Sequence, residues 1–274
     1  MRNKSNCTFK KLKKMSKRLE NKVIIVTGAS KGMGAGMAKM MSAEGAKVVV
    51  NYASSKTDAD NVVNEITKNR GTAIAVQGDI SKFEDVKHLF EETKKAFGKL
   101  DVLVNNAGMY NFAPLESVTE EAYRKTFDLN VLGVILASQE AIKMFDIKGG
   151  SIINISAALT RNPEAHQTIY ASSKSAVNSI TISLAQELGH KNIRVNAILP
   201  GPVITEGVKK MQANMPVKKV ETSEASNMGN KMISRTALGR IGKPEDIANM
   251  AVFLASDEAS FVTGQLIDLS GGYK

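Results

Sequence analysis

The sequence predicts an α/β fold, specifically a Rossmann-like doubly wound three-layer sandwich with a seven-stranded parallel sheet. Three observations predict it: seven short apolar runs, amphipathic stretches between them, and a glycine-rich turn after the first run. Each run is rich in β-branched residues and nearly apolar throughout, which is typical of parallel strands that are covered on both faces. The runs lie at 23–26, 48–50, 73–76, 102–104, 152–155, 193–198 and 266–269.

The stretches between the runs carry a helical pattern. Apolar and small side chains recur at helical spacing over 85–97, at Val86, Leu89, Phe90, Thr93 and Phe97. Residues 119–145 and 168–189 predict two longer helices, and another is expected from the glycine-rich turn to about Ala43. Strands that alternate with helices imply right-handed crossovers, and therefore a parallel sheet.

Charge sets the N-terminal 18 residues apart. The net charge is +10, but six basic residues lie within the first 14 positions, where there is no acid. We expect residues 1–18 to be a basic, disordered tail, with two alternatives: a start upstream of a natural beginning at Met15, or a segment that targets the protein or binds anionic surfaces. Because the remainder is only modestly basic, neither nucleic acid nor a membrane is an expected partner.

Residues 19–274 predict a single domain. Within it, 202–242 is rich in Lys, Met, Ser and Asn and carries no strand pattern. Long insertions of this kind are more often functional than idle, so we predict a lid over the carboxyl edge of the sheet, where doubly wound folds bind ligands. No apolar run approaches the roughly 20 residues of a membrane span. The one cysteine, Cys7, excludes an intramolecular disulfide and fits a cytoplasmic location.

A glycine-rich turn follows the first strand, with the sequence Thr27-Gly28-Ala29-Ser30-Lys31-Gly32-Met33-Gly34. Glycines permit a sharp turn and the close approach of a phosphate, and the next helix offers free N–H groups and its positive dipole end to a pyrophosphate. The spacing is Gly-x-x-x-Gly-x-Gly, unlike the commonest dinucleotide fingerprint. The turn therefore predicts a dinucleotide site, with a ligand-free tight connection as the alternative.

The end of the second strand favours NADP(H). A carboxylate at this place usually binds the adenosine ribose hydroxyls and selects NAD. Here the strand ends in Asn51-Tyr52-Ala53-Ser54, without an acid. Asn51, the Ser54 hydroxyl and Lys31 can instead accommodate a 2′-phosphate. NAD(H) is the alternative cofactor if Lys31 is an ordinary surface lysine.

Tyr170 and Lys174 form a candidate acid/base pair, because a spacing of four residues places both side chains on one helix face. A free phenol has a pKa of about 10 and is a poor base near neutrality. A nearby ammonium stabilises the phenolate and lowers that pKa. The pair can then donate a proton to a carbonyl oxygen or remove one from an alcohol.

Together these motifs resemble the short-chain dehydrogenase/reductase family, from about Leu19 to the C-terminus. The motifs are residues 27–34, Asp79, Asn105 to Gly108, Asn130, Tyr170 to Lys174 and residues 196–202. The chain is similar to the glucose 1-dehydrogenase and β-ketoacyl carrier-protein reductase types. The resemblance implies an NADP(H)-dependent oxidoreductase that interconverts a carbonyl and a secondary alcohol by hydride transfer. It also implies a small-molecule substrate and a homotetramer.

The resemblance further implies residue roles. Tyr170 would be the acid/base, Lys174 would also bind the nicotinamide ribose, and Asn130 would hold a water that links Lys174 to solvent. Asn105 would brace the central strand, and no metal is expected. The residues expected to contact the cofactor are Gly28, Ser30, Lys31, Gly32, Met33, Gly34, Asn51, Tyr52, Ser54, Asp79, Ile80, Asn106, Ala107, Gly108, Tyr170, Lys174, Pro200, Gly201, Val203 and Thr205.

Position 157 departs from the family pattern. Relatives usually carry a serine 13 residues before the catalytic tyrosine, whereas this chain has Ala157. Loss of one such donor can cost roughly 10²–10³ in rate. Ser156 is the nearest serine, but neighbouring side chains in a strand point to opposite faces. Three interpretations stand: a slow enzyme, a chain in which Ser156 or Thr160 takes the role, or a weakly active or non-catalytic nucleotide-binding protein.

Overall fold

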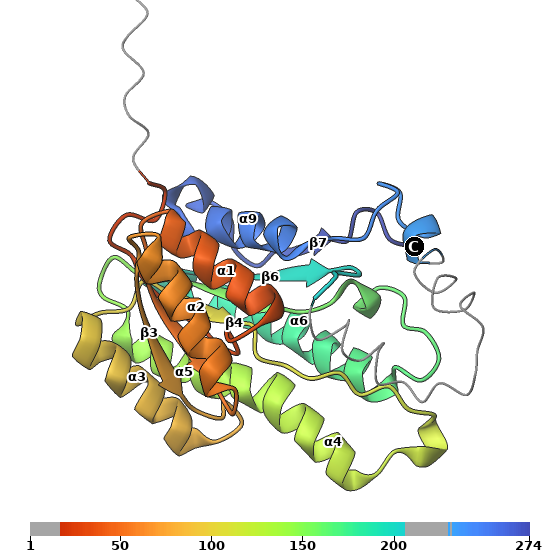
Figure 1. Cartoon of the computed structure of the whole chain (residues 1–274). Coiled ribbons are helices and arrows are strands. Elements are labelled where there is room, and N and C mark those ends of the chain that lie inside the picture. The colour runs from red at the N-terminus through yellow and green to blue at the C-terminus, as the bar shows by residue number, and fades with distance from the viewer. Residues whose placement is uncertain (1–16, 206–229, 231) are drawn as a thin grey trace, which may run out of the picture.

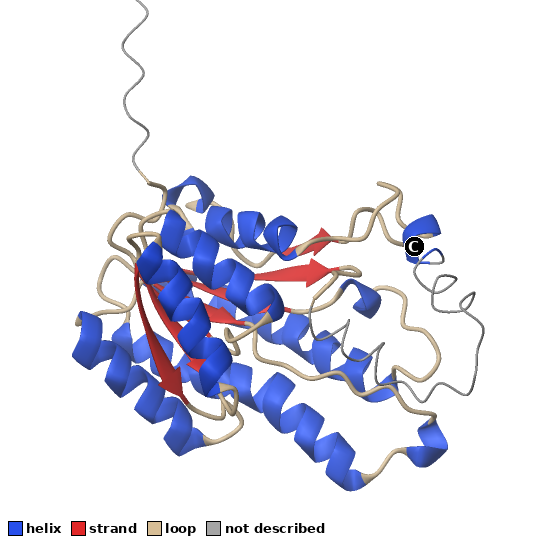
Figure 2. Ribbon diagram, in the orientation of Figure 1, coloured by secondary structure: helices blue, strands red, loops and turns tan. Residues whose placement is uncertain are grey.

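The computed structural model describes residues 17–205, 230 and 232–274, and in them it confirms the three-layer α/β sandwich (Figures 1 and 2). Seven parallel strands of the described chain form one sheet in the order β3-β2-β1-β4-β5-β6-β7. All seven predicted runs are strands, and five of them extend beyond the predicted bounds by one to three residues. The strands are β1 Val23–Val26, β2 Lys47–Tyr52, β3 Thr72–Gln77, β4 Val102–Asn105, β5 Gly150–Ile155, β6 Ile193–Pro200 and β7 Leu266–Leu269.

Helices cover both faces of the sheet (Figure 1). The helices of the described residues are α1 Gly32–Ala43, α2 Lys56–Lys68, α3 Phe83–Phe97, α4 Glu120–Phe127, α5 Gly133–Met144, α6 Thr168–Leu188 and α9 Pro244–Ala255. Alternate strand residues face opposite cores: Ile24 and Val26 pack with α1, α2 and α9, whereas Val23 and Ile25 pack with α3, α5 and α6. This two-sided burial explains why the strands are apolar without alternation.

The predicted helix at 119–145 is interrupted. A π-helical turn, Asp128–Leu132, joins α4 to α5 and contains Asn130, whose side chain is fully buried. A π turn inserts one extra residue into a helix and is frequent at functional sites. The prediction of one uniform helix is therefore wrong at this point, because hydrophobic periodicity is too coarse to register a one-residue insertion.

The carboxyl ends of β1 and β4 meet at the switch point of the sheet, because successive connections run in opposite directions from these two strands. Val26 pairs with Val104, so the glycine-rich turn after β1 lies beside Asn105 to Gly108 after β4. Two motifs separated by more than 70 residues thus form one crevice.

The two ends of the predicted lid are held together. Val203 and Gly242 form an isolated parallel bridge, in which the Ile204 N–H donates to the Gly242 carbonyl at 3.0 Å and the Gly242 N–H donates to the Pro202 carbonyl at 2.9 Å. Most of the predicted lid, residues 206–229 and 231, lies outside the described residues, as do residues 1–16 of the predicted tail.

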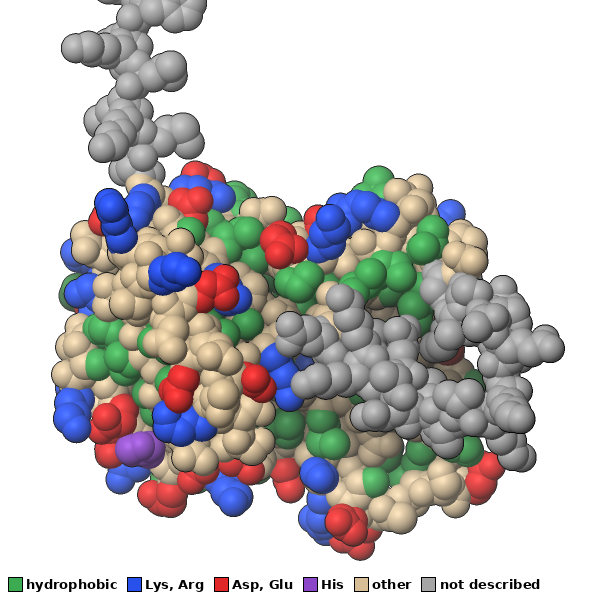
Figure 3. Space-filling view, in the orientation of Figure 1, with side chains coloured by type: hydrophobic (Ala, Val, Ile, Leu, Met, Phe, Trp, Pro, Cys, Tyr) green, Lys and Arg blue, Asp and Glu red, His purple; other side chains and the backbone are tan. Residues whose placement is uncertain are grey.

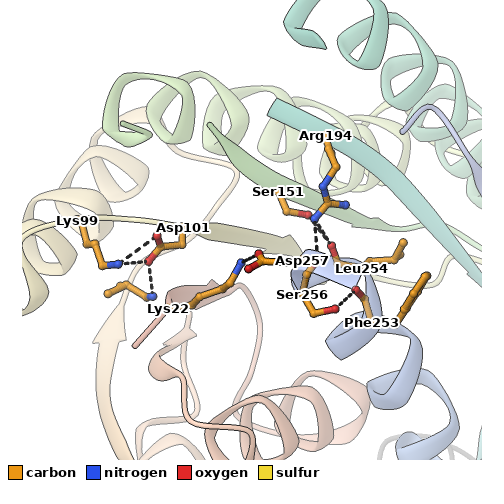
Figure 4. A network of polar contacts seen from close by, with 10 residues as sticks. Lys22, Lys99, Asp101, Ser151, Arg194, Phe253, Leu254, Ser256 and Asp257 are labelled. Atoms are coloured by element: carbon orange, nitrogen blue, oxygen red, sulfur yellow. Dashed lines mark hydrogen bonds and ion pairs between the residues drawn. The ribbon is translucent and has the colours of Figure 1, made fainter. Parts of the chain in front are cut away.

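The opposite, amino edge of the sheet is closed by polar contacts (Figure 4). The Asp101 carboxylate accepts from the Val23 N–H at 2.7 Å and pairs with Lys99 at 2.9 Å. Arg194 donates to the Leu254 carbonyl at 2.7 Å, which links β6 to the end of α9. On the face shown in Figure 3, acidic and basic side chains of the described residues lie interspersed.

Candidate active site

The turn between β1 and α1 has the geometry of a phosphate cradle. Gly28 and Gly32 have φ values of +61° and +60°, which favour glycine. A Cβ on Gly28 would lie 2.9 Å from Cα of Ala107, and a Cβ on Gly34 would lie 2.5 Å from Nδ2 of Asn106. α1 begins at Gly32, and its N-cap residue, Lys31, makes no side-chain cap bond. Closely packed glycines and uncapped donors fit the pyrophosphate of a dinucleotide.

Thr27 and Asn106 hold this cradle in place. The buried Thr27 hydroxyl donates to the Val104 carbonyl at 3.3 Å and accepts from the N–H groups of Asn106 and Ala107 at 3.0 and 2.9 Å. The Asn106 amide donates to the carbonyls of Thr27 and Gly28 at 2.8 and 3.1 Å. Thr27 was not among the predicted site residues, although its place directly before the glycines pointed to it. Asn106 therefore stabilises the backbone of the glycine-rich turn through these two bonds.

Asn51 has a different role from the one the sequence predicts. Its side chain is 1% exposed, its Oδ1 accepts from the Gly28 N–H at 3.1 Å, and its Nδ2 donates to the carbonyls of Gly78 and Val76 at 3.0 and 3.4 Å. Because its polar atoms are all engaged, Asn51 braces the glycine turn rather than meeting a 2′-phosphate. Tyr52 is likewise a core residue, buried in the cluster under α1 and α2.

Ser54 and Lys31, which are predicted to meet the 2′-phosphate, are exposed. Asp79 is partly buried, and its carboxylate accepts from the N–H and hydroxyl of Ser81 at 3.0 and 2.7 Å. Ile80 is 4% exposed and packs against Gly133, where a Cβ would lie 2.8 Å from its Cγ2. The Met33 side chain packs on the apolar core, so this residue can bind a phosphate only through its backbone N–H.

The residues predicted to face the nicotinamide follow the carboxyl end of β6, beside the end of β7. Pro200 pairs with Leu269, and a Cβ on Gly201 would lie 2.7 Å from Cα of Ser270. The Thr205 side chain lies over Gly32, where a Cβ would be 3.5 Å from its Cβ and Cγ2. Thr205 thus lies next to the glycine-rich turn.

Burial shifts the pKa values of both Tyr170 and Lys174. Both side chains are about 5% exposed on α6. Burial raises the pKa of the Tyr170 phenol, and the charge of Tyr110 raises it further. Burial also lowers the pKa of the Lys174 ammonium to about 8. The expected lowering of the Tyr170 pKa is therefore wrong for the chain by itself, because burial of the phenol has the largest effect on its pKa.

Lys174 and Asn130 converge on Gly108. The Lys174 ammonium donates to the Ile155 carbonyl at 2.8 Å. A Cβ on Gly108 would lie 3.3 Å from that ammonium and 3.2 Å from Oδ1 of Asn130, so any side chain there would crowd the pair. Asn130 also donates to the Ser173 hydroxyl at 3.0 Å. The structure thus brings three of the predicted site residues together.

A buried polar chain supports the floor of the site. Asn105 donates to Oδ1 of Asn154 at 2.9 Å, and Asn154 donates to the Thr181 hydroxyl at 2.9 Å. These bonds join β4, β5 and α6. The bracing role expected for Asn105 therefore has a geometric basis, and Asn154 and Thr181 are its partners.

The residues around position 157 offer no free serine hydroxyl. Ala157 is 5% exposed. The Ser156 hydroxyl donates to the Lys174 carbonyl at 3.0 Å. The Thr160 hydroxyl donates to the Ala157 carbonyl at 2.8 Å and accepts from Asn178 at 3.1 Å. Ser156 is committed to the backbone of α6, so this geometry does not support its predicted contact with substrate.

Two aromatic side chains that the sequence analysis did not single out cover Tyr170. The ring centroid of Tyr110 lies 5.1 Å from that of Tyr170, and the centroid of Phe112 lies 5.5 Å from it in an edge-on contact. Both rings are about half exposed. The available signal was two aromatic residues at the second and fourth positions after the Asn-Asn-Ala-Gly motif.

In residues 17–205, 230 and 232–274, no three His, Cys, Asp or Glu side chains come together as a metal site. Among the helices described, none has the length and apolar character needed to cross a bilayer.

Comparisons with known proteins agree with this architecture. A family model described as enoyl-(acyl carrier protein) reductase matches residues 28–274. An uncharacterized oxidoreductase of Methylorubrum extorquens is 50% identical over 260 residues, which cover 95% of this chain and 100% of the relative. A short-chain dehydrogenase/reductase of Pestalotiopsis microspora is 38% identical over 256 residues, covering 93% of this chain and 96% of the relative.

A solved structure is similar over nearly the whole chain. It is a blue fluorescent protein from a metagenomic library in complex with NADPH, 34% identical, with a TM-score of 0.81 over 93% of this chain and 98% of that chain. The fold, the site architecture and these relatives lead to one conclusion: the chain belongs to the short-chain dehydrogenase/reductase family of NAD(P)-dependent oxidoreductases.

Proposed function

We propose that the protein uses NADP(H) to interconvert a small-molecule carbonyl and a secondary alcohol, with Tyr170 as the acid/base. The observation that carries this proposal is the buried Tyr170 and Lys174 pair beside Gly108, at the same sheet edge as the glycine cradle. A bound nicotinamide supplies or accepts the hydride. Lys174 and Asn130 would relay the proton, and the glycine-rich turn would bind the phosphates of the cofactor.

During reduction, the Tyr170 hydroxyl gives its proton to the carbonyl oxygen as the carbon gains the hydride. A buried phenol with a raised pKa holds that proton firmly until charge develops on the oxygen. The phenolate that remains is stabilised when Lys174 is protonated. Lys174, whose pKa is about 8, can take up a proton near neutrality and pass it on, and Asn130 would hold the water that connects it to solvent.

NADP(H) preference follows from the exposed Lys31 and Ser54, the absence of an acid at the tip of β2, and the NADPH complex of the similar solved structure. NAD(H) is the alternative. Val203, Thr205 and Pro200 would face the nicotinamide, and the segment 202–242 would close over the substrate.

A homotetramer is the proposed assembly. Large apolar side chains are exposed on the π turn, on α5 and α6, and after α9; they include Leu132, Ile135, Ile182 and Phe261. Such surfaces mark association sites, and closed symmetry is usual for soluble homo-oligomers. We further propose that the enzyme acts in the cytoplasm, where the lone cysteine would stay reduced.

The test measures NADPH and NADH consumption over ketones, β-ketoesters, quinones and sugar lactones. Turnover of one class with NADPH is the expected result. Tyr170→Phe should lower kcat about 10²–10⁴-fold while NADPH still binds. Tyr123→Phe removes a phenol on α4, outside the site, and should change nothing. Retained activity in Tyr170→Phe would exclude the mechanism.

A second candidate function rests on Ala157. A weakly active or non-catalytic nucleotide-binding protein predicts NADPH binding without turnover across the whole panel. In that case Ala157→Ser would not create activity.

A further inference from the structure

The proposed reaction places developing negative charge on the substrate oxygen, and that oxygen can accept more than one hydrogen bond. Tyr170 supplies one donor. A second preorganised donor at such an oxygen is typically worth 10²–10³ in rate. This inference rests on the proposed function and asks which residue of the chain supplies that second donor.

The hydroxyls nearest in sequence to the family's serine position are already used. Ser156 donates to the Lys174 carbonyl, and Thr160 donates to the Ala157 carbonyl. Ser173, on the helix of Tyr170, donates to the Tyr170 carbonyl at 2.8 Å. A hydroxyl has a single proton, so each would have to give up a bond within the chain before it could donate to a ligand.

Tyr110 has its hydroxyl available. Two rings contact Tyr170, and of these only Tyr110 carries a donor, since Phe112 has no polar side-chain atom. Within the described residues, no hydrogen-bond partner is found for the Tyr110 hydroxyl. The side chain is 51% exposed, so a ligand can reach it.

Neighbouring rings allow two hydroxyls to meet at one ligand oxygen when both point to the same side. The ring centroids of Tyr110 and Tyr170 lie 5.1 Å apart with the planes tilted by 55°. Each O–H···O bond spans about 2.7 Å, so two hydroxyls serving one oxygen lie at most about 5.4 Å apart.

The backbone that carries Tyr110 is fixed on both sides. Asn130 accepts from the Met109 N–H at 2.9 Å and donates to the Met109 carbonyl at 3.1 Å. Beyond the rings, the Ala113 N–H donates to the His166 carbonyl at 2.9 Å. A donor on an anchored segment loses little entropy when substrate binds, which is the condition for efficient transition-state stabilisation.

We propose that the Tyr110 hydroxyl is a catalytic donor to the substrate oxygen and replaces the hydroxyl that Ala157 lacks. Asn130 then has a second task in this chain, because it positions the backbone of Met109 next to the donor. Tyr110 keeps its proton. Its hydroxyl stabilises the negative charge that develops on the substrate oxygen by donating a hydrogen bond to it.

The test compares four proteins on one substrate that the wild type reduces: wild type, Tyr110→Phe, Ala157→Ser and the double variant. Phenylalanine keeps the ring and removes only the hydroxyl. We expect Tyr110→Phe to lower kcat roughly 10²-fold with NADPH affinity unchanged. Ala157→Ser should change the wild type less than threefold but raise kcat at least tenfold in the Tyr110→Phe background.

Two results would overturn the proposal. One is a kcat of Tyr110→Phe within threefold of the wild type. The other is an equal effect of Ala157→Ser in both backgrounds, including no effect in either. Tyr123→Phe again serves as the matched loss of a phenol. A wild type that binds NADPH but reduces no carbonyl would instead overturn the proposed function, and this proposal with it.

Discussion

The two edges of the same sheet are built from different chemistry. At the amino edge, polar side chains find partners: Asp101 binds the Val23 N–H and Lys99, and Lys22 pairs with Asp257 at 2.6 Å (Figure 4). At the carboxyl edge, α1 begins without a side-chain cap, and Lys174 is buried without an acidic partner that shifts its pKa.

This contrast separates stability from function. Paired groups at the amino edge lower the free energy of the folded chain. Uncapped N–H groups and a buried amine at the carboxyl edge raise it, and they are the groups that a dinucleotide and a substrate can use. Functional sites commonly retain such strain or desolvation, which the rest of the fold offsets. Substitutions at the two edges should therefore have separable effects.

The largest expected effect is at Gly34. Gly34→Ala would force a Cβ to 2.6 Å from the Gly28 carbonyl oxygen and 2.5 Å from the Asn106 amide. We expect a loss of about 3 kcal/mol in the free energy of unfolding and at least tenfold weaker NADPH binding. Urea unfolding and fluorescence titration measure the two effects.

Gly98 provides the matched control at the other edge. It ends α3 with φ +75°, and a Cβ there would meet nothing within 4 Å. Gly98→Ala should cost only about 1 kcal/mol of backbone strain and leave NADPH affinity unchanged. Equal losses of affinity in both variants would remove the distinction between the edges.

The next effect concerns pH and Lys174. Because burial lowers the folded-state pKa from 10.5 to about 8, the folded chain binds fewer protons than the unfolded chain between these values. The free energy of unfolding should therefore rise with pH from about 8 to 10.5, by roughly 3 kcal/mol for this group. Lys174→Met should lack this rise and should also lose turnover. Parallel slopes for the two proteins, measured by urea unfolding without cofactor, would contradict the assignment.

A change at the amino edge should affect stability alone. Asp101→Ala leaves the Val23 N–H without its acceptor and Lys99 without its partner, which should cost about 1–3 kcal/mol. The values of kcat and KM should stay within twofold of the wild type. A fall in kcat in the folded variant would show that the edges are coupled.

The smallest effect is expected at Lys31. The side chain is exposed beside the phosphate cradle, so Lys31→Ala should weaken NADPH binding about fivefold and leave NADH binding unchanged. High salt should shrink the difference between the two cofactors. An equal loss for both cofactors would place Lys31 at the pyrophosphate instead of the 2′-phosphate.

The sequence predicted the strands well because strands buried on both faces are apolar runs, and it predicted the cradle because its glycines are local. The sequence-based predictions were wrong where the role of a residue depends on contacts with segments distant in the sequence. Asn51 and Ser156 have the right chemistry for a site, but their polar atoms are taken by backbone groups from distant segments. The raised pKa of Tyr170 depends on the burial that Tyr110 and Phe112 help to provide, which no spacing reveals.

The π turn at Asp128–Leu132 ties the position of Asn130 to the length of the helix. Removing one residue there would restore a regular α-helix, and because a π turn takes up its extra residue as a local bulge, the change would be concentrated at residues 128–132 while α4 and α5 stayed nearly in place. Asn130 would then leave the position from which it bonds Met109 and Ser173. The chain can therefore substitute residues along this helix far more easily than it can change their number, and length at this point is itself under functional constraint.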